Sequence, residues 1–260
     1  MFSFGSFLFI TSTNKNKILE QIELLRSLEG LQHVEIWWEH GEWTDDNTKW
    51  LREQLGDWQC IMHAPSINFT FVSTHKEQNE ASLSILKQKV DQARILKARV
   101  FTFHAGTRVF YINDEQAREI CAPYIKELIQ HSRNELKISI ENLPKQGGAF
   151  GGYPTNGQEV VRLLGLVPNL FTTLDVGHSY KSNDDYLTFI RNDSDKIANI
   201  HFHNTNEEGV EHFGFNKPGG IEPQKVIQVL KEADYQGYLT LEIVYDEDTR
   251  KSWDIIRSIV

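Results

Sequence analysis

Short runs rich in β-branched and aromatic residues alternate with segments of helical spacing along the whole chain. In one helical segment Leu19, Ile22 and Leu25 recur at intervals of three, and Gly30 follows them. Each strand-like run is followed by such a segment or by residues typical of helix starts. The predicted strands are Ser6–Ile10, His33–Trp38, Gln59–His63, Arg99–His104, Lys137–Glu141, Phe171–Asp175, Ile197–His203 and Tyr238–Glu242.

Eight consecutive strand–helix units in about 250 residues are the number and order found in a (β/α)8 barrel, or TIM barrel. We therefore predict one α/β domain of this fold over residues 1–260. A doubly wound open sheet is the alternative, and it is disfavoured because the first turn lacks a Gly-x-Gly-x-x-Gly pattern. The later helices are expected to begin near Asp46, Asp114, Asn156, Asp184, Pro223 and Asp246.

The two faces of the predicted strands differ in character. Side chains alternate between faces along a strand, so parity separates those that point into the barrel from those that lie under the helices. One parity is almost wholly apolar, as at Ile36, Phe103 and Ile140, and fits the layer under the helices. The other should point inward: Glu35, His63, Thr102, His104, Ser139, Glu141, Thr173, Asp175, Asn199, His201, His203, Thr240 and Glu242.

Ionisable side chains of the inward set gather at the carboxyl ends of the strands, the rim where TIM-barrel active sites form. Each alone could be a hydrogen-bonded structural residue. Several carboxylates at one rim, however, would repel one another or take up protons unless a cation lay among them. We therefore predict a divalent metal centre, with an unmetallated polar network as the alternative. The residues are His63, His104, Glu141, Asp175, His201 and Glu242.

Mixed imidazole and carboxylate donors favour zinc, manganese, iron or cobalt over magnesium or calcium, and we predict zinc or manganese. Two further histidines lie just beyond the rim. His178 could bind substrate or another ion, and His212 could do the same or be a solvated loop residue. Glu35 could contact substrate or tie layers of the barrel together, and we favour the second. His33, at a strand start, is assigned no role. The glycine-rich loop 146–152 fits a lid or a tight turn equally well.

Composition narrows the range of partners. The chain is 40% hydrophobic and 24% charged, as in folded soluble proteins. Its formal net charge of -9 makes a nucleic acid an unfavoured partner without excluding it. Cys60 and Cys121 have no paired spacing, so neither a disulfide framework nor a thiolate zinc site is expected, and a cytoplasmic location fits. No segment has the pattern of a signal peptide or a membrane span.

These strand-end residues resemble the xylose isomerase-like barrel superfamily, which includes sugar isomerases, ketose epimerases and type IV abasic-site endonucleases. The resemblance implies that Glu141, Asp175, His201 and Glu242 are the shared four-ligand metal site. It rests on the order of the motifs His63-Ala64-Pro65, Phe103-His104-Ala105-Gly106, Ile140-Glu141-Asn142, Leu174-Asp175-Val176-Gly177-His178, His201-Phe202-His203-Asn204 and Leu241-Glu242.

The remaining histidines have two interpretations within the family. His63 and His104 match positions that hold an additional metal in the endonucleases or line the substrate pocket in the sugar enzymes. His178 and His212 match members of the endonuclease third-metal site. His203 is also a candidate for binding substrate or an additional metal. The family pattern at that site is Asp-x-His, whereas this chain has Val210-Glu211-His212, so the carboxylate is displaced or missing.

Three functions follow from these residues. The first is a metal-dependent isomerase or epimerase of a small polyhydroxy carbonyl substrate, a sugar or sugar phosphate, in which Glu141 and Glu242 transfer a proton and the metal stabilises an enediolate. The second is a zinc phosphodiesterase acting on DNA, like the endonucleases, with two or three ions. The third is a non-catalytic metal-binding or ligand-binding barrel. The sequence leaves a homo-oligomer open.

Overall fold

The computed structural model describes residues 2–39, 43–145, 150–206, 208, 210–244 and 246–260. Within these residues eight parallel strands close into a barrel, because the first strand pairs with both the second and the last. The predicted TIM barrel is therefore confirmed and the open sheet is excluded. The barrel strands are β1 (Ser3–Ile10), β2 (His33–Trp38), β3 (Gln59–His63), β4 (Val100–Phe103), β6 (Lys137–Glu141), β8 (Leu170–Asp175), β9 (Ile197–Phe202) and β10 (Tyr238–Leu241).

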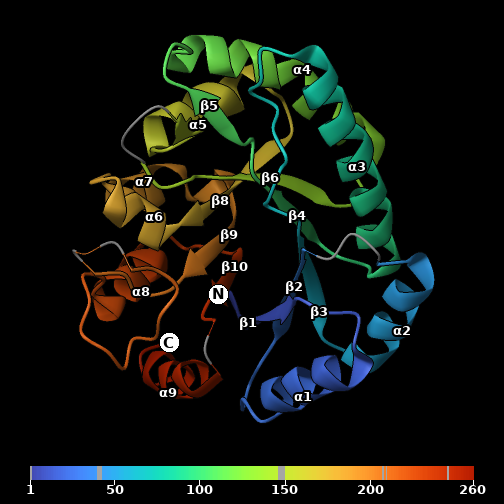
Figure 1. Cartoon of the computed structure of the whole chain (residues 1–260). Helices are drawn as coiled ribbons and strands as arrows, with labels where there is room; N and C mark the ends of the chain where they lie inside the picture. The colour runs from blue at the N-terminus through green and yellow to red at the C-terminus, as the bar shows by residue number, and fades with distance from the viewer. Residues whose placement is uncertain (1, 40–42, 146–149, 207, 209, 245) are drawn as a thin grey trace.

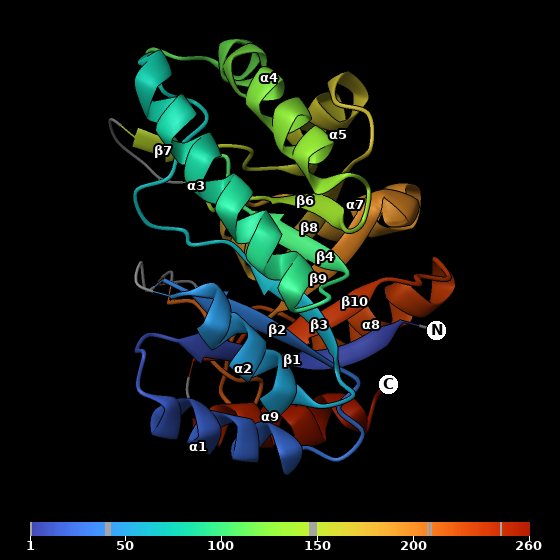
Figure 2. The same cartoon turned by 90° about the vertical axis from the view of Figure 1, so that its right-hand side faces the viewer.

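Helices surround the barrel as an outer ring (Figure 1). The first and last helices lie side by side at the bottom of both views and close that ring (Figure 2). The helices are α1 (Lys15–Arg26), α2 (Asp45–Leu55), α3 (Lys76–Ile95), α4 (Asp114–Ser132), α5 (Gly157–Leu166), α6 (Val176–Lys181), α7 (Tyr186–Asp193), α8 (Pro223–Glu232) and α9 (Asp246–Arg257), with a 3-10 turn, η1 (Ser194–Lys196).

Polar side chains cap the helix starts near the predicted positions. The Asn113 side chain accepts from the backbone N–H of Gln116 at the start of α4, and Asn156 accepts from Glu159 at the start of α5. These bonds satisfy N–H groups that have no partner within the helix. The helices therefore begin where short acceptor side chains stand in the sequence.

As predicted from strand parity, one face of the strands is apolar and packs under the helices, and the other face points into the barrel. Ile36, Phe103 and Ile140 are completely buried in the apolar core. On the inward face, Thr102 Oγ1 lies 2.9 Å from Thr173 Oγ1, which is 2.8 Å from Ser139 Oγ. The lumen of a TIM barrel is usually filled by branched apolar residues. This barrel instead carries hydrogen-bonded polar side chains along much of its axis.

Two short strands that the sequence analysis did not predict lie above the rim. β5 (Thr107–Val109) pairs antiparallel with β7 (Phe150–Gly152) and so joins the loops that follow β4 and β6. β7 is the end of the glycine-rich loop; residues 146–149, where a lid or turn was considered, lie outside the described residues. A Cβ at Gly152 would lie 2.5 Å from Leu143 Cβ, so close packing requires glycine there. No helix in the described part of the chain is long and apolar enough to cross a membrane.

Candidate metal centre

Four strand ends bring their side chains together at the carboxyl rim. Glu141 ends β6, Asp175 ends β8, His201 lies in β9 and Glu242 follows β10. One donor atom from each lies within 4.8 Å of the others, and all four residues are buried. His201 Nδ1 is 3.3 Å from Glu141 Oε1, 3.1 Å from Glu242 Oε2 and 4.0 Å from Asp175 Oδ2. Three carboxylates therefore converge on one imidazole nitrogen.

The hydrogen bonds around this quartet fit a cation. His201 Nε2 lies 3.0 Å from Glu35 Oε1, a carboxylate oxygen, so Nε2 carries the proton and Nδ1 is the nitrogen that faces the quartet. His201 Nδ1 and Glu242 Oε2 are buried and have no aligned hydrogen-bond partner. An unpartnered buried polar atom costs about 1–3 kcal/mol. Metal coordination would satisfy both atoms, and the mixed nitrogen and oxygen donors suit zinc or manganese.

The pKa of each quartet residue depends on its charged neighbours. Burial alone would raise the pKa of Glu141, but the imidazoles of His201 and His104 hold it well below its ordinary value. Burial would likewise raise the pKa of Asp175, and His178 and His203 lower it. Burial would lower the pKa of His201, whereas the surrounding carboxylates raise it well above its ordinary value. A proton and a divalent ion are thus alternative sources of the positive charge that these carboxylates attract.

A second group shares Glu141 with the quartet. His63 Nε2 lies 2.9 Å and His104 Nε2 3.1 Å from the same oxygen, Glu141 Oε2. His63 Nδ1 is 2.6 Å from the carbonyl oxygen of Ala64, which can only accept, so Nδ1 carries a proton and Nε2 faces Glu141. The donor atoms of the three residues lie within 4.8 Å of one another. Glu141 could therefore bridge two ions.

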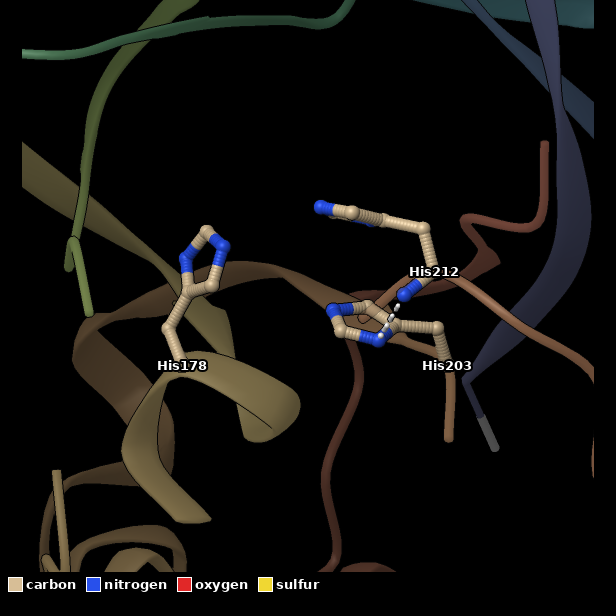
Figure 3. Close-up of side chains that lie close together, drawn as sticks. All are labelled: His178, His203 and His212. Carbon is tan, nitrogen blue, oxygen red and sulfur yellow. Dashed lines mark hydrogen bonds between the residues drawn. The ribbon is translucent and has the colours of Figure 1, made fainter. Parts of the chain in front are cut away.

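A third group contains His178, His203 and His212, whose rings approach one another (Figure 3). His178, on α6, donates from Nδ1 to the carbonyl oxygen of Asn142 at 2.9 Å, which leaves Nε2 as its acceptor. His212 Nδ1 is buried without a hydrogen-bond partner. These two nitrogens are available to an ion or to a substrate hydroxyl group.

His203 is more fully engaged than its two neighbours. Its Nε2 lies 3.2 Å from both carboxylate oxygens of Asp175. Its Nδ1 is 3.1 Å from the carbonyl oxygen of Asn204, but the backbone N–H of His212 points at it from 3.0 Å, so Nδ1 acts as an acceptor. Nε2 then carries the proton and donates to Asp175. His203 is therefore better suited to hold Asp175 than to bind an ion.

An acidic side chain, Glu211, lies near this third group of histidines. Glu211 Oε1 lies 4.0 Å from His178 Nε2 and is buried without a hydrogen-bond partner, while Glu211 Oε2 accepts from Lys181 Nζ at 3.1 Å. Glu211 precedes His212 directly, where the family pattern has its acid two residues before the histidine. The sequence shows an acidic residue next to His212. Only the folded structure shows that this side chain approaches His178.

Two large hollows flank the barrel. One of about 890 Å³ is lined by His104, Gly106 and the segment 66–70, and so opens beside the second group. Another, of about 900 Å³, is lined by Ser3, Gln59 and Tyr238 at the opposite mouth of the barrel. Within the described residues no member of the three donor groups lines this second hollow. Of these two hollows, the one lined by His104 is therefore the one that touches a donor group.

A family model described as a xylose isomerase-like TIM barrel matches residues 22–259. The chain belongs to this family. The resemblance seen in the strand-end motifs is thereby confirmed. An uncharacterized protein of Methanocaldococcus jannaschii, MJ1311, is 24% identical over 227 residues, which cover 81% of this chain and 74% of that protein.

Solved structures of other proteins share this fold. A D-allulose 3-epimerase from Methylomonas sp. superimposes with a TM-score of 0.82 at 15% identity, covering 100% of this chain and 97% of that one. An AP endonuclease of family 2 from Brucella melitensis gives 0.77 at 16% identity and covers 99% of both chains. At these identities the similarity shows a shared fold, so the reaction must be argued from the residues of the rim.

Proposed function

We propose that this protein is a divalent-metal-dependent isomerase or epimerase of a small polyhydroxy carbonyl compound, a sugar or a sugar phosphate. The observation that supports it is the convergence of Glu141 and Glu242 on His201 Nδ1, at 3.3 and 3.1 Å, in a buried cluster that also contains Asp175. A protein of the same fold binds D-allulose. We assign the quartet as the metal ligands and its two glutamates as the proton-transfer groups.

The reaction would be removal of a proton from the carbon beside the carbonyl group and return of a proton to the substrate. A bound divalent ion would stabilise the negative charge that develops on the substrate oxygens. Glu242 would take the proton through Oε1, because its Oε2, buried without an aligned hydrogen-bond partner beside His201 Nδ1, would serve the ion. Glu141 would deliver a proton that it receives from His63 or His104, since both histidines contact its Oε2, and the proton held by Glu242 would pass to solvent. His178 Nε2 would accept a hydrogen bond from a substrate hydroxyl group.

Exchange of substrate hydrogen with solvent tests this assignment. Sugars and sugar phosphates incubated in D2O with zinc- or manganese-loaded protein should take up deuterium at the carbon next to the carbonyl, as seen by proton NMR. Glu242→Gln and Glu141→Gln should each lower exchange at saturating ion by about 100- to 10,000-fold, the usual value of general acid–base transfer. Glu127→Gln, at an exposed ion pair with Lys87, is the matched control. Full exchange by the Glu141 and Glu242 double variant would refute the assignment.

A second candidate, phosphodiester hydrolysis, is favoured by one observation. Glu141 is shared between the quartet and the His63–His104 pair, and carboxylate-linked metal pairs are typical of phosphodiester-cleaving enzymes. The charges around the rim argue against DNA as the substrate, since Arg108 pairs with Asp114 and Lys217 with Asp248. We therefore rank this function second.

The number of ions per chain separates the candidates. About one zinc or manganese ion, measured by elemental mass spectrometry and lost in Asp175→Ala, would support the isomerase. Two or three zinc ions, together with cleavage of a duplex containing an abasic site, would favour the hydrolase. A bound ion without either activity would favour a non-catalytic metal-binding barrel.

A further inference from the structure

A chain of hydrogen bonds crosses the barrel lumen from its N-terminal mouth towards the metal centre. Ser3 Oγ lies 2.9 Å from His33 Nδ1, and His33 Nε2 lies 2.9 Å from Thr240 Oγ1. Thr240 in turn bonds Asn199 Oδ1 at 2.9 Å, and Asn199 Nδ2 donates to Glu35 Oε2 at 2.7 Å. Four strands contribute to this chain, and every member after Ser3 is completely buried.

The direction of these bonds is fixed at the carboxylate. Asn199 must turn its amide nitrogen towards Glu35, so its oxygen accepts from the Thr240 hydroxyl. Thr240 then accepts from Nε2–H of His33, and His33 Nδ1 accepts from the Ser3 hydroxyl. His33 is neutral in this arrangement, which agrees with burial lowering its pKa to about 3. Each hydrogen bond in the series therefore pairs one donor with one acceptor.

Glu35 joins this chain to the metal centre. Its Oε2 accepts from Asn199, and its Oε1 accepts from His201 Nε2 at 3.0 Å. Both oxygens are therefore engaged, and the residue is completely buried on β2. The bond to His201 fixes the rotation of the imidazole and leaves Nδ1 facing Glu141 and Glu242.

We infer that Glu35 is a positioning residue of the metal centre, held by the buried chain from Ser3 and holding His201 with its Nδ1 towards the ion. This inference rests on the metal centre of the proposed function. A carboxylate that accepts from the second nitrogen of a ligating histidine fixes its tautomer and makes it a stronger donor. Loss of such a partner commonly weakens metal binding by about 10- to 100-fold.

Gly5 leaves space for the imidazole of His33 in this series of hydrogen bonds. A Cβ on Gly5 would lie 2.5 Å from atoms of the His33 imidazole, closer than side chains can pack. Glycine at this position of β1 therefore allows the His33 ring to enter the lumen between Ser3 and Thr240.

Two variants separate positioning from a structural role. Glu35→Gln keeps the size of the side chain and one acceptor for His201, but its amide would meet Asn199 Nδ2 donor to donor. Adding Asn199→Asp supplies a carboxylate that can accept from that amide and from Thr240, so every hydrogen bond is restored while the negative charge no longer contacts His201. We expect the double variant to recover thermal stability but not zinc affinity.

The experiment measures the zinc dissociation constant by competition with a chromophoric chelator, and thermal unfolding of metal-free protein. Glu35→Gln and the double variant should bind zinc about 10- to 100-fold more weakly than wild type. Thr102→Val, which breaks the buried bond to Thr173 in the same lumen, should lower stability and leave affinity within about twofold. Unchanged affinity in Glu35→Gln, or an equal loss in Thr102→Val, would overturn the inference.

Nitrogen NMR of 15N-histidine-labelled wild type adds a measurement that needs no variant to fold. His201 Nε2 should carry a proton with and without zinc, because Glu35 Oε1 can only accept. A neutral ring protonated at Nδ1 alone would overturn the inference. Wild type that binds neither zinc nor manganese would overturn it together with the metal centre, whereas bound ion without sugar turnover would refute only the proposed reaction.

Discussion

Gly177 lies in α6 directly against the His203 ring, and Gly177→Ala tests how firmly that ring is held. A Cβ at this position would lie 2.6 Å from His203 Nε2 and closer still to the neighbouring ring carbon, so the imidazole must move. Movement breaks its bond to the Asp175 carboxylate, worth about 1.5–3 kcal/mol, and its bond from the His212 N–H, worth about 1 kcal/mol. Alanine also stabilises the helix by about 0.5–1 kcal/mol relative to glycine, which offsets part of this loss.

The expected net loss is about 2–3 kcal/mol in the free energy of unfolding, or roughly 5–10 °C in Tm for a chain of this size. Urea unfolding followed by circular dichroism measures it. Gly165→Ala is the matched control, because a Cβ at Gly165 in α5 would meet no atom within 4 Å. That control should gain about 0.5–1 kcal/mol. If Gly177→Ala were within about 0.5 kcal/mol of wild type, the close packing of His203 under α6 would be refuted.

Three further outcomes are expected. Zinc or manganese at 100 times its Kd should add about 2.7 kcal/mol to the free energy of unfolding and raise Tm by roughly 5–10 °C, as measured by differential scanning fluorimetry. Asp175→Asn should lose most of this rise in Tm, although the asparagine can still cap α6. The pKa of His33 is lowered to about 3 in the folded protein by burial, so the unfolded chain takes up the proton first as pH falls below about 6.5. Stability should therefore decline from pH 6.5 towards pH 4 more steeply in wild type than in His33→Gln, and equal slopes in urea titrations would contradict this. Gly5→Ala should cost about 1–3 kcal/mol because the added methyl group overlaps His33, and an unchanged Tm would show that the lumen can relax.

The quartet could be predicted because each of its residues stands at the end of a strand. Strand composition and alternation are local properties, so Glu141, Asp175 and Glu242 could be placed on the inward face at the carboxyl rim without knowledge of the barrel. The eight barrel strands were predicted for the same reason, within a few residues at either end.

The partners of the quartet could not be predicted in this way. Glu35 and His201 are 166 residues apart in the chain, and which inward side chains meet depends on the stagger of the barrel, which parity does not specify. His33 shares the parity of Glu35 but stands at a strand start, far from the rim. The short strands β5 and β7 have three residues each, too few for alternation to be recognised.

The polar lumen sets a limit on how this barrel could be engineered. Most TIM barrels fill the same space with valine, isoleucine and leucine, and a library screened for heat resistance would tend to introduce such residues at Thr240 and Asn199. The same replacements would cut the hydrogen bonds that hold Glu35 against His201. Selection for thermostability and selection for ion binding would then act on the same positions in opposite directions, so a useful screen of this scaffold must score both properties in every round.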